Sequence, residues 1–239
     1  MESQKSKLAI KIFADGADLS VIKRLKEAGL VKGFTTNPSL MRKAGVQDYK
    51  IFAEQVIEMA PDLPLSLEVF SDNLEEMEAQ ARTISSWGKN VFVKIPVMNT
   101  QRTFTGPILT ALSRDGIKLN VTALMSVEQS KNVLECLRGN TPIILSIFSG
   151  RIADTGRDPI PIIAQCVDLL QNFNNIELLW ASTRELLNVV QADKLGCDII
   201  TVGEDILDKI DLIGKDLDDF SRETVEMFYN DALGSKFKI

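Results

Sequence analysis

The chain has 239 residues, of which 45% are hydrophobic and 25% charged, and its formal net charge is −6. This composition is typical of a soluble globular protein, and the negative charge argues against nucleic acids and anionic membranes as its main partners. The sequence has no run of 18 apolar residues, so we expect no membrane span.

Two residue types narrow the chemistry. There is no histidine, so proton transfer falls to Asp, Glu, Tyr, Lys or water. The three cysteines, Cys136, Cys166 and Cys197, are widely spaced and form neither a metal motif nor a disulfide framework. We therefore expect a reducing compartment, that is, a cytoplasmic location.

Strands and helices are predicted to alternate along the whole chain. The expected elements, in order, are strand Leu8–Ala14, helix Asp18–Ala28, a short strand that breaks into a turn within Lys32–Ser39, helix Asp48–Ala60, strand Leu65–Phe70, helix Leu74–Trp87, strand Val91–Val97, helix Thr103–Arg114, strand Lys118–Ala123, helix Ser126–Leu137, strand Pro142–Phe148, helix Pro159–Asn172, strand Ile176–Ala181, helix Arg184–Ala192, strand Cys197–Val202, helix Glu204–Lys209 and helix Leu217–Ala232.

Eight strand–helix units without a linker predict an α/β fold with a single (β/α)8 TIM barrel over residues 1–239 and an extra C-terminal helix at about 217–232. The alternative is a doubly wound open sheet. It is disfavoured because no glycine-rich phosphate-binding motif follows the first strand.

The strand Val91–Val97 contains one charged residue, Lys94. Side chains alternate between the faces of a strand, so Lys94 shares the inner face with Phe92 and Pro96. A buried amine loses its charge more easily and becomes nucleophilic, which indicates a Schiff-base lysine. From this strand alone, a lysine that reaches water is the commoner explanation.

Polar side chains end seven of the eight predicted strands, where a barrel has its active site. They are Asp15; Thr35, Thr36 and Asn37; Ser66 and Glu68; Lys94; Asn120 and Thr122; Ser146, followed by Arg151; and Ser182 with Arg184. Each also has a structural explanation. Asp15 could cap a turn, Asn37 could be a turn residue, Glu68 could form an ion pair, Ser182 could be a helix N-cap, and the arginines could lie on the surface. Lys11 and Asp15 are four residues apart, so both would point into the barrel. Either Lys11 reaches water at the bottom of the barrel, or the strand is bulged.

At these positions the sequence resembles the transaldolase family, and its short-chain members in particular. The matching segments are Gly33-Phe-Thr-Thr-Asn-Pro-Ser-Leu40, Ser66-Leu-Glu-Val69, Val93-Lys-Ile-Pro-Val97, Leu119-Asn-Val-Thr-Ala-Leu124, Ser146-Ile-Phe-Ser-Gly-Arg-Ile152 and Ala181-Ser-Thr-Arg184. They occur in the family's order over nearly the whole chain.

The resemblance implies a Schiff-base transfer without metal or other cofactor. Lys94 would attack a ketose carbonyl, Asp15 would accept the proton during C–C cleavage, and Glu68 with Thr122 and a held water would relay protons. Thr36, Asn37, Asn120, Ser146 and Phe148 would contact the substrate. Arg151, Ser182 and Arg184, with the N-terminus of the helix that follows, would bind the phosphate of a sugar phosphate.

Three functions remain open. The first is transaldolase activity, which moves a dihydroxyacetone unit between sugar phosphates. The second is fructose-6-phosphate aldolase or a related sugar aldolase, although that branch has Gln at the position of Glu68 and Tyr at the position of Phe148. The third is a catalytically silent sugar-phosphate-binding barrel.

We expect a homo-oligomer. The helix 217–232 presents Phe220, Val225, Met227 and Phe228, and either a neighbouring subunit or its own barrel would cover them.

Overall fold

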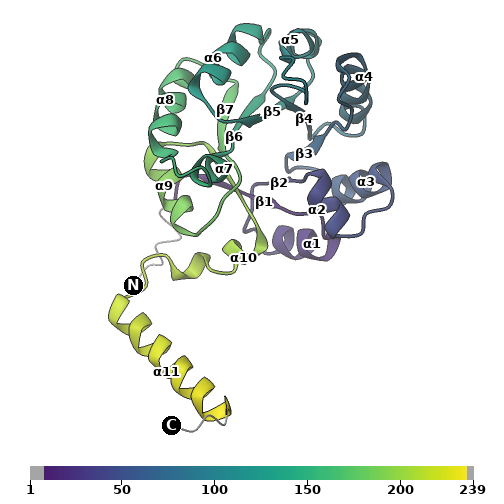
Figure 1. Ribbon diagram of the computed structural model, residues 1–239. Coiled ribbons are helices and arrows are strands. Elements are labelled where there is room, and N and C mark those ends of the chain that lie inside the picture. Colours follow the sequence, from purple (N-terminus) through teal and green to yellow (C-terminus); the bar gives the residue numbers. More distant parts are fainter. Residues whose placement is uncertain (1–7, 236–239) are drawn as a thin grey trace.

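The computed structural model describes residues 8–235, and at its centre is a closed barrel of eight parallel strands (Figure 1). Each strand pairs with its neighbours in the sequence, and β8 closes the barrel against β1. The strands are β1 (Lys11–Asp15), β2 (Gly33–Thr35), β3 (Leu65–Glu68), β4 (Val91–Pro96), β5 (Leu119–Leu124), β6 (Ile143–Ile147), β7 (Ile176–Trp180) and β8 (Ile199–Val202). The predicted (β/α)8 barrel is confirmed, and the doubly wound alternative is wrong.

Helices surround the barrel (Figure 1). They are α1 (Leu19–Glu27), α2 (Pro38–Lys43), α3 (Tyr49–Met59), α4 (Leu74–Ser85), α5 (Gly106–Arg114), α6 (Val127–Cys136), α7 (Ser149–Ala153), α8 (Ile160–Leu170), α9 (Leu187–Leu195) and α10 (Glu204–Leu207), and one further helix, α11 (Leu217–Ser235), follows them in the chain. Local capping explains where several of them begin. The Asp18 carboxylate, for example, accepts hydrogen bonds from the backbone N–H groups of Ser20 and Val21 at the start of α1.

Two short helices, α2 and α7, were not predicted, and α9 begins at Leu187 instead of Arg184. The side-chain oxygen of Asn188 accepts hydrogen bonds from the backbone N–H groups of Arg184 and Glu185, which holds these two residues in a turn before the helix. The observed N-terminus of α9 therefore lies three residues further along the chain from Ser182 than predicted.

The apolar residues form two layers, one inside the barrel and one between the strands and the helices. The inner layer contains Phe13, Phe92, Ile144, Leu179, Ala181 and Ile199. A Cβ atom at Gly33 would lie 2.5 Å from the ring of Phe13, so the glycine makes room for this ring. In the outer layer, Val91, Val93 and Ile95 of β4 are almost fully buried. The alternation confirms that Phe92 and Lys94 point inward.

Lys11 lies at the opposite end of the barrel from Asp15. Its side chain is about half exposed and forms an ion pair with Glu177 of β7. Lys11 therefore points inward and reaches water at the bottom of the barrel, which is the first of the two explanations given above.

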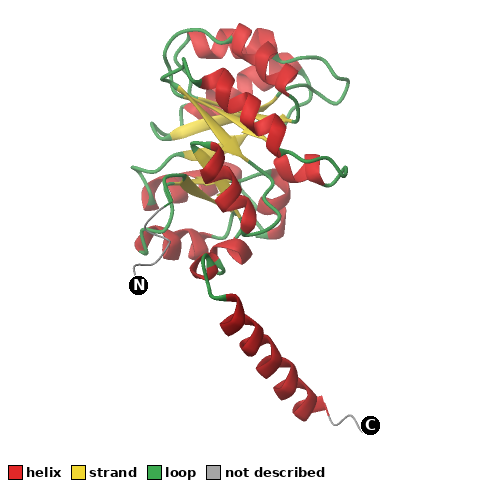
Figure 2. Cartoon of the chain, turned by 90° about the vertical axis from the view of Figure 1, so that its left-hand side faces the viewer, coloured by secondary structure: helices red, strands yellow, loops and turns green. Residues whose placement is uncertain are grey.

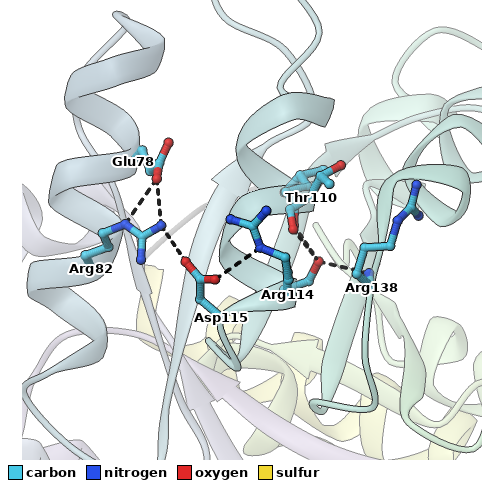
Figure 3. Close-up of polar contacts among 8 residues, drawn as sticks. Glu78, Arg82, Thr110, Arg114, Asp115 and Arg138 are labelled. Atoms are coloured by element: carbon cyan, nitrogen blue, oxygen red, sulfur yellow. Dashed lines mark hydrogen bonds and ion pairs between the residues drawn. The ribbon is translucent and has the colours of Figure 1, made fainter.

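On the outside of the barrel, charged side chains connect neighbouring helices. Arg82 of α4 binds Glu78 on its own helix at 2.7 Å and Asp115, just after α5, at 2.8 Å (Figure 3). Exposed pairs of this kind contribute only about 0–1 kcal/mol each. We therefore assign the packing of α4 against α5 mainly to their buried apolar faces.

Helix α11 extends away from the barrel (Figures 1 and 2). None of its 19 residues is buried, although it presents several large apolar side chains: Leu217, Phe220, Val225, Met227, Phe228, Tyr229 and Leu233. In this structure the helix does not pack on its own barrel. Among the described residues, no helix is long and apolar enough to cross a membrane.

Candidate active site

Lys94 is at the centre of the site. It lies on the inward face of β4. Its amine donates a hydrogen bond to the backbone oxygen of Thr36 at 2.8 Å and lies 3.2 Å from Oε2 of Glu68. The residue is only 6% exposed. Strand register explains this contact, because Glu68 of β3 pairs with Lys94, and Lys94 pairs with Asn120 of β5. A lysine this well buried is uncommon and needs a partner, which Glu68 provides.

A chain of buried hydroxyl and amide groups crosses the barrel beside the lysine. The Ser146 hydroxyl donates to the amide oxygen of Asn120 at 2.7 Å, and the amide nitrogen of Asn120 donates to the Ser66 hydroxyl at 3.0 Å. All three residues are at most 2% exposed. These bonds fix the orientation of the Asn120 amide.

Asp15 enters the site from β1. The Thr35 hydroxyl donates to Oδ1 of Asp15 at 2.7 Å, and Thr35 is itself hydrogen-bonded to the hydroxyl of Thr201 on β8. Burial raises the pKa of the Asp15 carboxyl above its usual value, while the nearby Lys94 amine and the Thr35 hydroxyl lower it and the Glu68 carboxylate raises it further. The net direction is upward, which indicates a carboxyl group that can exchange protons closer to neutral pH than an ordinary aspartate.

Most of the predicted site residues line one cavity of about 110 Å³. It is lined by Asp15, Thr35, Asn37, Lys94, Asn120, Thr122, Ser146, Phe148, Arg151, Leu179, Ala181, Ser182 and Thr201. Nine of the twelve predicted site residues are in this lining. Thr36, Glu68 and Arg184 are not: Thr36 and Glu68 reach the site through their contacts with Lys94.

Thr122 lies next to an irregularity in β5. The register of β5 against β6 shifts between Val121 and Leu124, and Ala123 takes the left-handed conformation with φ 60°. Bulges of this kind are frequent beside active sites, where they re-aim a side chain. The Thr122 hydroxyl is buried and has no hydrogen-bond partner among the described residues, as is also true of the Thr36 hydroxyl. Thr122 is therefore available to a substrate or a water molecule.

The structure separates the two predicted phosphate arginines. Arg151 lines the cavity, with its guanidinium 5.9 Å from the ring centre of Phe148. Arg184 instead binds the Asp154 carboxylate through two hydrogen bonds of 3.1 and 2.6 Å, and donates a third to the backbone oxygen of Ser182. This arrangement lowers the pKa of the Asp154 carboxyl, because the Arg184 guanidinium donates to it and Arg151 is also nearby.

Ser182 and Asn37 have local roles that differ from one another. Ser182 is not a helix N-cap, because α9 begins five residues later, at Leu187, and Ser182 has a left-handed φ of 62°. Asn37 does cap a helix: its side-chain oxygen accepts from the backbone N–H of Leu40 in the unpredicted helix α2. Both residues nevertheless line the cavity.

Sequence reasoning assigned no role to three polar residues that contact the predicted site. Thr35 and Thr201 position Asp15, and Ser66 positions Asn120. Thr35 was already expected at this end of the second strand, and alternation was a sufficient signal for Thr201, because it shares its face with the inward Ile199. All eight strands, not seven, therefore bring a polar group to this end of the barrel.

The chemistry of the site follows from these groups. No cluster of three or more potential metal ligands occurs within residues 8–235. A buried amine between a carboxylate and a carbonyl, with a second carboxyl of raised pKa across a small polar cavity, can form and protonate a covalent adduct with a carbonyl compound. The fold and the site thus define an enzyme of the (β/α)8-barrel class with its groups at the C-terminal ends of the strands.

Comparisons with known proteins identify the family. Residues 12–238 match the model of the family described as transaldolase/fructose-6-phosphate aldolase. A protein of Dehalococcoides mccartyi is 35% identical over 200 residues, covering 83% of this chain and 88% of that protein. A protein of Caldicellulosiruptor saccharolyticus is 36% identical over 203 residues, covering 84% and 89%. Both are named probable transaldolase. The chain belongs to the transaldolase/fructose-6-phosphate aldolase family and is an enzyme of the transferase class.

Solved structures agree with the fold alone. A structure of KGPDC from Streptococcus mutans superposes with a TM-score of 0.54 at 8% identity and covers 85% of this chain and 92% of its own. A dihydrodipicolinate synthase from Rhodopseudomonas palustris has a TM-score of 0.50 at 14% identity and covers 93% of this chain and 79% of its own.

Proposed function

We propose that this chain is a transaldolase that moves a dihydroxyacetone unit between sugar phosphates through a Schiff base on Lys94. The observation that carries the proposal is the position of the Lys94 amine, buried at the wall of the cavity and 3.2 Å from the Glu68 carboxylate. Attack on the ketose carbonyl requires a neutral amine, and a carboxylate within reach can accept the proton that the amine gives up.

Asp15 acts as the base of the C–C cleavage step. Once the imine has formed, a proton must leave the hydroxyl group on the carbon that becomes the aldehyde. The raised pKa of Asp15 suits this task, since a general base works best when its pKa is near the working pH. Its hydrogen bond from Thr35 orients one oxygen, and the other remains available to the substrate.

Glu68 and Thr122 relay protons while the carbinolamine forms and loses water. The assignment of Glu68 is supported by its contact with Lys94, and that of Thr122 by its unpartnered hydroxyl in the cavity. Thr36 contributes through its backbone oxygen, which holds the Lys94 amine in place.

The dihydroxyacetone unit binds against the polar wall of the cavity. Asn120 and Ser146 are fixed to one another by a hydrogen bond, so they present preformed partners to hydroxyl groups. Asn37 contributes its amide, and Phe148 offers an apolar face beside Arg151.

Arg151 and Ser182 bind the phosphate, and Arg184 positions Ser182 from outside the cavity. This division is supported by the placement of Arg151 and Ser182 in the cavity wall and by the bonds of Arg184 to Asp154 and to the Ser182 backbone. Of the two arginines expected to bind the phosphate, only Arg151 lines the cavity and can contact it directly in this conformation.

Borohydride trapping tests the proposal and separates it from the aldolase alternative. Protein incubated with fructose 6-phosphate is reduced with borohydride and examined by intact mass and peptide mapping, with and without erythrose 4-phosphate. We expect a dihydroxyacetone adduct on Lys94 that the acceptor consumes. An adduct that hydrolyses equally fast without acceptor indicates fructose-6-phosphate aldolase. The absence of an adduct on any lysine indicates a binding protein.

We also propose that residues 1–239 form one domain that works as a homo-oligomer in the cytoplasm, with α11 packed on a neighbouring subunit. The support is the wide apolar face of α11, which covers much of the helix and is left in contact with solvent in a single chain. Large exposed apolar patches on soluble proteins generally mark interfaces.

A further inference from the structure

Lys94 and Glu68 are paired, yet they line different cavities. Lys94 lines the cavity of about 110 Å³ described above, whereas Glu68 lines a second cavity of about 460 Å³ beside the residues that follow β3 and β4. The side chain of Glu68 is 21% exposed and that of Lys94 only 8%. The carboxylate is therefore the more exposed of the two groups, and it borders a cavity that Lys94 does not line.

The loops that line the second cavity are tied together, and part of its lining is apolar. The Asp72 carboxylate accepts hydrogen bonds from the backbone N–H of Thr100 at 2.8 Å and from its hydroxyl at 2.6 Å, which ties the loop after β3 to the loop after β4. Pro38, Pro96 and Met98 form part of the wall. Met98 is the flexible side chain among these three, so a substitution there is a direct way to change the space beside Glu68.

A Schiff-base enzyme moves one water molecule in each direction per cycle. During imine formation the carbinolamine loses its oxygen as water. During release, a water oxygen bonds to the imine carbon and gives one proton to a base, the C–N bond breaks, and the nitrogen takes up a proton to restore the amine. These water molecules need a route to the imine, because the sugar unit bound to Lys94 occupies the substrate cavity of about 110 Å³.

We propose that the cavity behind Glu68 is this water route, separate from the entrance of the sugar phosphates. The inference rests on the proposed function. It assigns Met98 the role of a gate that acts through water access to Glu68 and does not touch the sugar. It also implies that the width at Met98 determines how quickly dihydroxyacetone is lost from the enzyme when no acceptor arrives.

The test uses Met98→Trp to narrow the route and Met98→Ala to widen it. Met125→Trp is the matched control, because Met125 follows β5 as Met98 follows β4 but lines neither of the two cavities. Each protein is loaded with fructose 6-phosphate, passed through a desalting column, reduced with borohydride at successive times and weighed by mass spectrometry. Loss of all adduct measures hydrolysis. After addition of erythrose 4-phosphate, conversion of the dihydroxyacetone adduct into the heavier seven-carbon adduct measures the C–C step.

We expect Met98→Trp to slow hydrolysis about fivefold and Met98→Ala to accelerate it by a similar factor, because water access is the step changed. Conversion between the two adducts stays at the wild-type rate in both variants, and Met125→Trp behaves as wild type. If the hydrolysis rate is the same in all four proteins, the water route is overturned but the proposed function is not. The same holds if Met98→Trp slows hydrolysis and conversion by the same factor. A wild-type protein without any adduct overturns the proposed function, and this inference with it.

Discussion

A Cβ atom at position 150 would lie 1.7 Å from the backbone oxygen of Ser182, closer than any real contact allows. Gly150 therefore lets the first turn of α7 lie against the backbone of Ser182, two residues after the end of β7. Ser182 itself is held in a left-handed conformation, with its backbone oxygen bonded to Arg184. The contact brings Arg151 and Ser182 to the same edge of the cavity, although 31 residues separate them in the sequence.

Gly150→Ala is expected to separate these two segments. The backbone has to move, so we expect a loss of about 1–3 kcal/mol in the free energy of unfolding and a raised KM for phosphorylated substrates. Thermal unfolding and steady-state kinetics measure the two effects. Gly16→Ala is the control, because a Cβ atom there meets nothing within 4 Å. If Gly150→Ala has the same KM as Gly16→Ala, the contact has no part in binding phosphate.

Asp15→Asn is expected to abolish C–C cleavage while increasing stability near neutral pH. The pKa of Asp15 is raised in the folded protein, so between the unfolded value and the folded value the native state binds more protons than the unfolded state. In that window stability falls as pH rises, and above it the buried carboxylate destabilises the fold. Removing the charge by Asp15→Asn eliminates this cost.

Two measurements check the Asp15 prediction. The melting temperature of Asp15→Asn should exceed that of the wild type at pH 7 and approach it at acidic pH. Wild-type activity should decline on the acidic side at a higher pH than an ordinary aspartate would give, since the base must be ionised. A melting temperature of Asp15→Asn below that of the wild type at pH 7 would show that the Thr35 hydrogen bond outweighs the burial of the charge.

Glu68→Gln is expected to slow imine formation and hydrolysis without changing the C–C step. Glutamine keeps the shape of the side chain but cannot carry a proton between water and the Lys94 amine. A reduction of about 10²–10⁴-fold is typical for the loss of a general acid–base group. Borohydride trapping after rapid mixing with fructose 6-phosphate follows the rate of imine formation. Glu76→Gln, at an exposed glutamate in the first turn of α4, is the control.

Arg151→Ala is expected to weaken the binding of phosphorylated substrates more than Arg184→Ala does. Arg151 lines the cavity, whereas the guanidinium of Arg184 is occupied by Asp154 and the Ser182 backbone. Loss of a charge-assisted hydrogen bond costs about 1.5–3 kcal/mol, or roughly 10–150-fold in KM. Comparing KM for glyceraldehyde 3-phosphate and for glyceraldehyde as acceptors isolates the phosphate contribution. Equal effects of the two variants would mean that Arg184 turns inward when phosphate binds.

Phe228→Glu is expected to dissociate the proposed oligomer. Phe228 lies on the apolar face of α11 and is 63% exposed in the single chain. The control is Asn230→Glu, which places the same charge about 200° further round the helix, on its polar side. Sedimentation velocity distinguishes the assemblies. An unchanged oligomer in Phe228→Glu would show that another surface forms the contact.

The barrel and most of the site were predictable because alternation in a strand depends only on local geometry. Phe92 and Lys94 point inward as their parity requires, and Glu68 meets Lys94 through ordinary strand pairing. Helices α2 and α7 were not predictable in the same way. Each has six residues or fewer and follows a strand directly, so neither shows the repeating apolar pattern of a longer helix.

The arrangement of the arginines also depended on tertiary contacts. The sequence places Arg151 and Arg184 after adjacent strands, and both appeared equally suited to an anion. Which of them reaches the cavity is decided by Asp154, at the end of α7, whose two carboxylate oxygens both accept hydrogen bonds from Arg184. That competition between a carboxylate and a substrate phosphate has no signature in residue spacing.

The hydrogen bond between Thr35 and Thr201 has a consequence for the order of assembly. Asp15 emerges near the beginning of synthesis, but Thr201, which completes its hydrogen-bond chain, belongs to the last strand. Closure of β8 against β1 joins segments almost 190 residues apart, the kind of distant contact that forms late in folding. A nascent chain on the ribosome therefore carries its lysine long before it has a working active site, and it cannot bind sugar phosphates productively until the barrel has closed.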